Sequence, residues 1–498
     1  MNHHKAPLLE ALIKHRNEKV APFHVPAHKH GRFKMQNFSE LVGDAVMEID
    51  LTFTRDLDGL HSPVGDILHA EQLAADAYGA DHAYFLVNGT SCGVQAMIMA
   101  ACRPGDKILV PRNVHKSVLS GLVFTGAIPV YIQPEHSGFW DFALQITPEA
   151  VEAAISEHPD ARALFVVNPT YFGVAADLER IVNICHKKGL MVLADEAHGG
   201  NLYFHEDDAA HWPLSAMRAG ADMSAISTHK TTGSMTQSSL LLLNETDALK
   251  KHGISAHDMR ITLSLLHTTS PSYVLLASLD AARREMHFSG RAHVQKAIDF
   301  ANYTKEQIRN IPRLKILEDD EVVGRGFKYE PTKLVFSGKE LGLKGGIFKG
   351  ELRDKHGIEL EMSLFYNGLA LFSVGDDQEN VDRLVKGIKS VFAGHAAREI
   401  PKPPQMAVLP IPKCEMIPRV AHFIDKSRLE QIDFKDAIGR ITAEVALAYP
   451  PGIPLVVPGE RIDEGIYEYI TAMLSNEYVM DFQGPEFKAL EKIWVVRE

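Results

Sequence analysis

The sequence is poor in cysteine and in long apolar runs, and it carries no excess of positive charge. Four cysteines, Cys92, Cys102, Cys185 and Cys414, lie far apart without CxxC spacing, which argues against a disulfide framework or a zinc knuckle. No apolar run reaches the roughly 18–20 residues of a membrane span, and the N-terminus lacks the apolar region of a secretory signal. With 64 acidic against 52 basic residues, the formal charge is −12, so the chain has no excess of positive charge with which to bind a nucleic-acid backbone. We therefore expect a cytoplasmic protein without a membrane or nucleic-acid partner.

Several catalytic motifs are also missing. The chain has no GxGxxG dinucleotide fingerprint, no GxxxxGK[ST] phosphate loop and no HExxH zinc motif. His24, His28 and His30 lie close together in the sequence, but no carboxylate pattern accompanies them. The sequence therefore predicts no metal site.

The pattern of apolar runs predicts an α/β fold with several domains. From about residue 65 onward, runs of four to eight apolar residues alternate with helix-like segments, as buried parallel strands do. We predict an N-terminal arm over 1–44, a large domain with a mostly parallel sheet over 45–275 and a small α+β domain over 276–397. A proline-rich linker over 398–418 and a C-terminal α+β domain over 419–498 follow. The strands predicted for the large domain are 83–87, 107–111, 128–132, 163–167, 190–194, 223–227 and 239–243.

Polar residues follow two of these predicted strands. Gly89, Thr90 and Ser91 combine a tight turn with hydroxyls at the start of a helix, which suits a phosphate, although an ordinary helix cap has the same composition. Asp195 ends a buried strand, where a carboxylate needs a cationic partner, and His198 follows it. A helix cap or a structural ion pair is the alternative for Asp195. Because parallel strands end at one edge of a sheet, we expect these groups to converge.

A third cluster contains a lysine. Ser227, His229 and Lys230 follow the strand over 223–227, and an amine in such a crevice is suited to Schiff-base formation, although a lone lysine is usually a surface charge. His115 follows the strand over 107–111 and would reach the same edge. An amine, a phosphate cup, an imidazole for ring stacking and a carboxylate for a ring nitrogen are together what pyridoxal 5′-phosphate requires. We expect this cofactor.

The segment Ser227-Thr228-His229-Lys230 resembles the lysine signature of the Orn/Lys/Arg decarboxylases, which are fold type I pyridoxal-phosphate enzymes. The likeness extends over most of the chain in the family's order, through residues 61–65, 88–91, 112–117, 195–199, 268–271, 449–454 and 458–460. Ala27 departs from the glycine usual in the family's N-terminal Pro-Gly-His-Lys motif. If that position needs a positive φ, alanine is strained there by roughly 1 kcal/mol, and substrate choice is the property put in doubt.

The resemblance implies roles for these residues. Lys230 would hold the cofactor, Asp195 would pair with the pyridinium nitrogen, and His115 would stack on the ring; these are the predicted catalytic residues. The further cofactor contacts that it implies are Gly89, Thr90, Ser91, His198, Ser227, His229, Thr268 and Thr269. In this family the segment with Thr268 and Thr269 comes from the neighbouring subunit, so we expect a homodimer or higher homo-oligomer with a shared active site.

The substrate is predicted from the same resemblance. The chain is similar to the shorter bacterial branch, which is best known for decarboxylating arginine to agmatine in polyamine biosynthesis. We expect a basic amino acid, with arginine ahead of lysine and ornithine. Glu460 is a candidate partner for the guanidinium group, with a solvated acidic turn as the alternative, and His28 is a second candidate. Aminotransfer, C–S lysis and a non-enzymatic regulator that binds the cofactor remain open.

Overall fold

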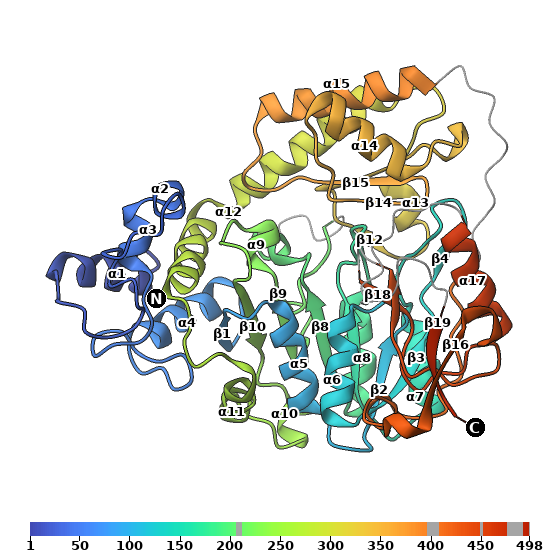
Figure 1. The fold of residues 1–498 in the computed structure, drawn as a ribbon, viewed down its shortest axis with the longest axis horizontal. Helices are drawn as coiled ribbons and strands as arrows, with labels where there is room; N and C mark the ends of the chain where they lie inside the picture. The colour runs from blue at the N-terminus through green and yellow to red at the C-terminus, as the bar shows by residue number, and fades with distance from the viewer. Residues whose placement is uncertain (206–211, 396–407, 449–451, 476–491, 498) are drawn as a thin grey trace. The chain divides into compact units, whose positions relative to one another are not determined.

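The computed structural model describes residues 1–205, 212–395, 408–448, 452–475 and 492–497 (Figure 1). Its residues form two compact units that alternate along the chain. The first comprises 1–101, 191–209 and 214–294, and the second comprises 102–190, 210–213 and 295–498. Within the described residues, no helix is both long enough and apolar enough to span a membrane.

Four strands form the centre of the first unit. In spatial order they are β1 (His82–Leu86), β10 (Ser239–Leu243), β9 (Met223–Ile226) and β8 (Met191–Glu196). β8 and β9 are parallel, whereas β10 is antiparallel to both of its neighbours. β10 therefore begins at the edge where β1, β8 and β9 end.

Helix α5 (Thr90–Ala101) packs directly on these four strands (Figure 1). Gly93 permits the close approach, because a Cβ atom there would lie 2.8 Å from Cδ1 of Leu86 and 3.1 Å from Cβ of Ala225. The absence of a side chain at this position sets the distance between the start of α5 and the strand ends.

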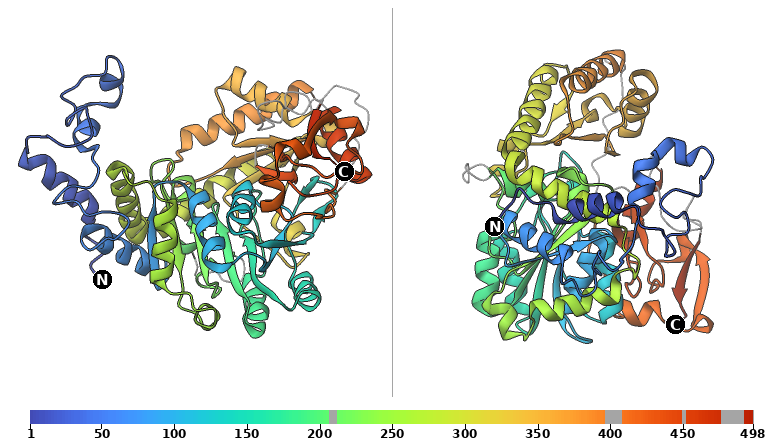
Figure 2. Two further views of the ribbon diagram at one scale, coloured as in Figure 1. Left: turned by 60° about the horizontal axis from the view of Figure 1, so that its bottom comes forward. Right: turned by 90° about the vertical axis from the view of Figure 1, so that its left-hand side faces the viewer.

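The N-terminal segment contains helices α1 (Pro7–Glu18), α2 (Phe38–Val42) and α3 (Asp44–Ile49). α1 packs on α4 (Asp66–Ala77), and both lie near the start of α12 (Tyr273–Ile308) in the two views of Figure 2. Residues of α12 hold the segment in place: Asp280 accepts a hydrogen bond from the backbone N–H of Leu8 at 3.0 Å, and Arg283 donates to the carbonyl of Lys5 at 2.7 Å. The segment is therefore anchored to the rest of its unit.

The second unit contains three parallel strands in the order β6 (Ala161–Val167), β2 (Lys107–Pro111) and β3 (Ile128–Ile132). Helices alternate with these strands along the chain, as expected for α/β units. They are α6 (Lys116–Thr125), α7 (Pro148–Glu157) and α8 (Leu178–Lys188).

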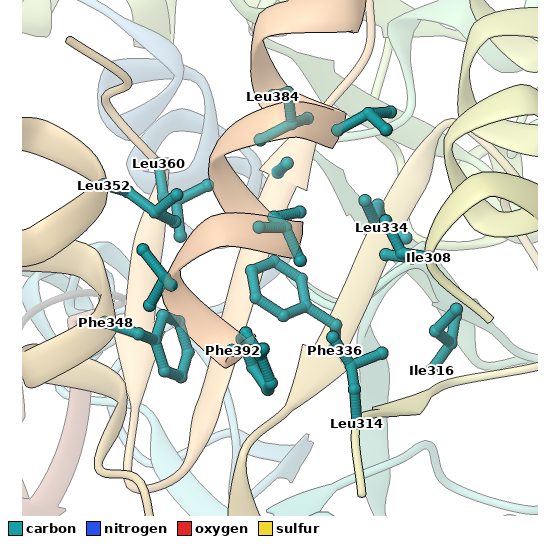
Figure 3. Close-up of a cluster of buried hydrophobic side chains, with 14 of the residues drawn as sticks. Ile308, Leu314, Ile316, Leu334, Phe336, Phe348, Leu352, Leu360, Leu384 and Phe392 are labelled. Carbon is teal, nitrogen blue, oxygen red and sulfur yellow. The ribbon is translucent and has the colours of Figure 1, made fainter. Parts of the chain in front are cut away.

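A separate antiparallel sheet of the second unit has its own apolar core. Its strands follow the order β11 (Lys315–Ile316), β13 (Lys333–Ser337), β15 (Asn367–Leu371) and β14 (Met362–Leu364). Helices α14 (Gly345–His356) and α15 (Gln378–His395) contribute to the same core. Figure 3 shows this cluster, in which Phe336, Phe348 and Phe392 pack against one another.

The C-terminal part of the second unit has two small antiparallel pairs and one helix. β16 (Leu429–Asp433) pairs with β19 (Lys492–Val496), and β17 (Ala446–Ala448) pairs with β18 (Ile453–Val456). Helix α17 (Glu464–Ser475) packs on β18.

All seven strands predicted for the large domain are confirmed, with ends within two residues of the predicted ones. The mixed α/β architecture with mainly parallel strands is confirmed as well, β10 being antiparallel to β1 and β9. Residues 398–407 of the predicted linker and 449–451 of the C-terminal motif lie outside the described residues. The predicted domain boundaries stay a prediction.

Candidate functional site

Three hydroxyl groups of the first unit meet at the start of α5. Gly89 has a φ of 77° and turns the chain out of β1, so that the helix begins at Thr90. The buried Thr90 hydroxyl is hydrogen-bonded to the hydroxyl of Ser227, which follows β9, and lies 2.8 Å from the hydroxyl of Ser239, the first residue of β10. Because first-turn amides of a helix lack intrahelical partners, hydroxyls and N–H groups together suit a phosphate.

The sequence of residues 89–93 matches the GxSxG pattern of serine hydrolases, but the geometry of the turn does not. The buried and hydrogen-bonded hydroxyl belongs to Thr90, whereas Ser91 is exposed. A nucleophile elbow requires the serine at the strained tip of the turn. Here the turn presents Thr90 to two further hydroxyls, which is the arrangement of an anion cradle.

The loop after β9 carries the lysine. Helix α9 (Thr228–Thr231) is held at its start because Thr228 donates to the carbonyl of Ser238 at 3.1 Å, and Nδ1 of His229 lies 2.8 Å from the same oxygen. Nζ of Lys230 lies 3.0 Å from Nε2 of His198. Burial lowers the pKa of His229, and the nearby charge of Lys230 lowers it further. The amine of Lys230 thus lies close to the imidazoles of both His198 and His229.

Asp195 lies at the end of β8, paired with Ala225 of β9. Its side chain is buried (5% exposed), and one carboxylate oxygen accepts a hydrogen bond from the N–H of Ala197 at 3.0 Å. Burial raises the pKa of Asp195, and the N–H of Ala197 and the charge of Lys230 offset only part of that rise. A further cation beside this carboxylate would therefore be stabilising.

Glu196, which the sequence did not single out, fixes the turn after β8. Its fully buried carboxylate accepts hydrogen bonds from Tyr203 at 2.5 Å, from the Ser224 hydroxyl at 2.7 Å and from the N–H of Ala216 at 2.8 Å. The sequence feature that could have identified Glu196 is its place as a second acidic residue at the end of an apolar strand. These three bonds tie the end of β8, next to Asp195, to the segments that carry Tyr203, Ala216 and Ser224.

The predicted contacts Thr268 and Thr269 lie after α11 (Ala256–Leu266). The N–H of Thr268 donates to the side-chain oxygen of Asn88 at 3.4 Å, and Nε2 of His61 lies 3.1 Å from the carbonyl of Thr268. Thr268 therefore lies beside the loop after β1 of its own chain, and Thr269 is exposed. That these residues reach the site of a neighbouring subunit stays a prediction.

Two predicted site residues belong to the second unit. His115 is the N-cap of α6, and its Nδ1 accepts a hydrogen bond from the N–H of Ser117 at 3.2 Å. Glu460 is fully buried: Arg112 donates to it at 3.0 Å and the N–H of Val457 at 2.8 Å. The alternative of a solvated acidic turn at Glu460 is therefore wrong. The roles of His115 in ring stacking and of Glu460 in substrate binding stay predictions.

The second substrate candidate, His28, is engaged on both ring nitrogens. Its Nε2 lies 3.2 Å from Asp50, and its Nδ1 accepts from the N–H of Gly31 at 3.2 Å. Ala27 does not adopt a positive φ, so the strain considered for alanine at this position is absent. The non-glycine residues of this turn with positive φ are Lys29 (53°) and His30 (56°).

The residues of the first unit fit pyridoxal 5′-phosphate. The cofactor needs an amine for its aldehyde, donors for its phosphate and an acid for its ring nitrogen. Lys230 would supply the amine, and the hydroxyls around Thr90 would supply donors. Asp195 would supply the acid, as a buried carboxylate whose burial is only partly compensated. The loops after β1, β8 and β9 therefore bring together the groups that the sequence predicted at this edge.

Comparison with protein families gives two matches along the chain. The family described as Orn/Lys/Arg decarboxylase, major domain, matches residues 6–380. The family described as Orn/Lys/Arg decarboxylase, C-terminal domain, matches residues 404–485.

Curated relatives match over the whole length. The chain is 42% identical over 502 residues to the arginine decarboxylase of Bacillus subtilis, covering 100% of this chain and 99% of that protein. It is also 42% identical to the arginine decarboxylase of Halalkalibacterium halodurans, covering 99% and 98%. The lysine decarboxylase LdcA of Pseudomonas aeruginosa is 24% identical, covering 92% and 74%.

Solved structures share the fold. Lysine decarboxylase A from Pseudomonas aeruginosa superimposes with a TM-score of 0.84 at 22% identity, covering 99% of this chain and 80% of that one. The lysine decarboxylase LdcF of Francisella novicida gives a TM-score of 0.83 at 20% identity, covering 99% and 81%. A serine palmitoyltransferase from Sphingomonas wittichii gives 0.52 at 17% identity, covering 70% and 80%. The architecture is thus that of fold type I pyridoxal-phosphate enzymes.

Proposed function

The chain belongs to the Orn/Lys/Arg decarboxylase family, and we propose that it converts L-arginine to agmatine and CO2. As a member of this family it is a pyridoxal-phosphate-dependent amino acid decarboxylase. The observation that carries the choice of arginine is the full-length identity of 41–42% to relatives named arginine decarboxylase. Identity to the lysine decarboxylase LdcA is only 24%, and the chain covers 74% of that protein.

The bound cofactor supplies an electron sink for the electron pair left behind when CO2 departs. In the proposed site Lys230 offers its amine to the cofactor aldehyde, with His198 accepting a hydrogen bond that orients this amine. Asp195 keeps the ring nitrogen protonated, since a buried carboxylate favours a cation beside it. Lys230 or His115 returns a proton to the α-carbon.

The proposal is tested by incubating purified holoenzyme separately with arginine, lysine and ornithine, and measuring CO2 and the amine product. We expect arginine to give the highest kcat/KM. A higher kcat/KM for lysine or ornithine would refute the choice of arginine. A keto acid in place of CO2 would indicate aminotransfer, and cofactor absorbance without turnover of any of the three would favour a regulator.

Glu460 remains our candidate contact for the substrate guanidinium. Its Oε1 is buried and has no hydrogen-bond partner among the described residues, so this oxygen is able to accept a bond. The other oxygen, Oε2, accepts a hydrogen bond from Arg112 at 3.0 Å. If Glu460 binds substrate, Glu460→Gln raises KM for arginine more than it lowers kcat. An unchanged KM in a folded variant assigns Glu460 to the ion pair alone, and His28→Gln is tested in the same way.

We also propose a homodimer or a higher homo-oligomer. The N-terminal segment exposes several large apolar side chains, which in a stable protein are usually covered by a partner. They include Phe23, Val25, Phe33 and Leu41, with Phe23 96% exposed. Light scattering on the purified holoenzyme should give at least twice the mass of the chain, and a monomer at micromolar concentration would contradict this.

A shared active site is tested separately by mixing two inactive variants. If Thr268 contributes to the site of the neighbouring subunit, a hybrid dimer of one Lys230→Ala chain and one Thr268→Tyr chain has one site with both wild-type residues. Such hybrids should regain activity. Absence of any regained activity in proven hybrids would show that each chain completes its own site. A cytoplasmic location is our further inference, supported by four cysteines that form no disulfide bond in the structure, and cell fractionation tests it.

A further inference from the structure

Three histidines converge near the N-terminus of the first unit. His15 lies in the last turn of α1, and His24 and His30 lie in the loop that follows. One ring nitrogen of each lies within 4.8 Å of the other two. The ring centroids are 5.5 Å apart for His24 and His30, 5.6 Å for His15 and His30, and 6.4 Å for His15 and His24. Imidazoles bound at 2.0–2.1 Å to a tetrahedral ion would have centroids about 5 Å apart.

The nitrogens of this cluster are buried without hydrogen-bond partners. His15 is only 5% exposed, and neither of its ring nitrogens has a partner among the described residues. Nε2 of His24 and Nε2 of His30 are likewise buried and unpartnered. Buried polar atoms almost always find a partner, because leaving one unpaired costs about 1–3 kcal/mol. An ion coordinated at this point would satisfy all three rings together.

The tautomer of His24 is also the one that a metal needs. Its Nδ1 lies 2.6 Å from the carbonyl of Val25, so Nδ1 carries the proton and donates it. The lone pair is then on Nε2, which is buried and has no hydrogen-bond partner among the described residues. Metal-binding histidines typically donate their other ring N–H to a carbonyl or carboxylate in this way.

Two carboxylates lie close to this cluster and would attract a bound cation. Ligand atoms of His15, Glu18 and Asp56 also lie within 4.8 Å of one another, which places carboxylates near the same imidazole.

From this geometry we propose that His15, His24 and His30 bind a zinc ion that links the end of α1 to the following loop. Three imidazoles suit Zn2+ among the common divalent ions, and the fourth position is left for water or a carboxylate. The sequence predicted no metal and grouped His28 with His24 and His30. In the structure the third histidine of the cluster is His15 and not His28, because the ring nitrogens of His28 contact Asp50 and Gly31.

The inference does not depend on the decarboxylase activity, and direct zinc binding tests it. Chelator-treated holoenzyme is dialysed against Zn2+, and bound zinc per chain is measured by mass spectrometry. We expect one zinc per chain, with at least tenfold weaker binding in His24→Ala and in His30→Ala. His4→Ala is the matched control, since His4 is an exposed histidine near the N-terminus that lies outside this cluster.

Equal zinc uptake by the wild-type and both cluster variants, or none by the wild-type, overturns the inference. Thermal unfolding provides a second measurement that needs no variant. Zn2+ should raise the unfolding temperature of the wild-type, because a ligand that binds only the folded state stabilises it. Mg2+ should not, because it prefers oxygen ligands in an octahedral arrangement. Failure of Zn2+ to raise the unfolding temperature also counts against the site.

Discussion

Nζ of Lys230 lies 3.0 Å from Nε2 of His198, so the amine of the loop after β9 and the imidazole of the turn after β8 are in direct contact. In this pair the ammonium donates and Nε2 accepts, which places the proton of a neutral His198 on Nδ1. The imidazole therefore orients the amine without competing with Asp195 for its charge.

Replacing His198 with alanine should remove this orientation. We expect His198→Ala to retain bound cofactor but to lose on the order of 10²-fold in kcat, the scale of a misplaced proton-transfer group. His198→Gln should recover part of the loss, because its amide oxygen can accept from Lys230. The measurements are kcat and the pH dependence of the visible cofactor band. If alanine and glutamine behave alike, the contact has no positioning role.

Thr90 should control cofactor affinity. Thr90→Val keeps the shape of the side chain but removes the hydroxyl that contacts Ser227 and Ser239. Loss of one hydrogen bond in a buried site costs about 1–3 kcal/mol, so the Kd for pyridoxal 5′-phosphate should rise about 5-fold to 150-fold. The Kd is measured by equilibrium dialysis. Thr262→Val on α11 is the control, since the Thr262 hydroxyl bonds only to its own helix.

Asp195 should lower the stability of the cofactor-free protein as the pH rises. Burial raises its folded pKa above the ordinary 3.8, so the folded state binds the proton more tightly than the unfolded state does. Ionisation therefore destabilises the fold increasingly above pH 3.8. Asp195→Asn carries no charge, and its cofactor-free form should unfold at a higher temperature than the wild-type at pH 8, with a smaller difference at pH 4, close to the ordinary pKa of 3.8.

The same variant should lose several orders of magnitude in activity when it is loaded with cofactor, because asparagine cannot hold the ring nitrogen protonated. The stability and activity effects thus have opposite signs. A wild-type and variant with equal unfolding temperatures at both pH values would contradict the assigned pKa direction. Near-normal turnover would contradict the assigned role.

The sequence was sufficient for the part of the site that parallel strands organise. The polar groups around Thr90, Asp195 and Lys230 each follow a recognisable apolar run, and strand direction alone brings them to one edge. Contacts between residues that are far apart in the sequence could not be predicted, because they leave no pattern in the neighbouring residues. The sequence offered Glu460 as a substrate contact or as part of a solvated acidic turn, and it did not reveal the ion pair with Arg112, which is far away in the sequence and meets Glu460 only in the folded chain.

Gly93 should be required for both stability and cofactor binding. The added Cβ of Gly93→Ala would lie 2.8 Å from Leu86 and 3.1 Å from Ala225, and both neighbours belong to buried strands that cannot yield freely. Overpacking of this kind costs about 1–3 kcal/mol, more than alanine gains from its higher helix propensity. Moving α5 outward would also separate Thr90 from Ser227, so cofactor affinity should fall together with stability.

Gly350→Ala in α14 is the matched control, because a Cβ atom at Gly350 has no neighbour within 4 Å. Only helix propensity acts there, so this variant should be more stable than the wild-type by about 0.5–1 kcal/mol. Chemical denaturation of both variants, with cofactor Kd measured alongside, separates the two effects. If Gly93→Ala matches Gly350→Ala in stability and keeps wild-type affinity, the close approach of α5 to the strands does not set the position of Thr90.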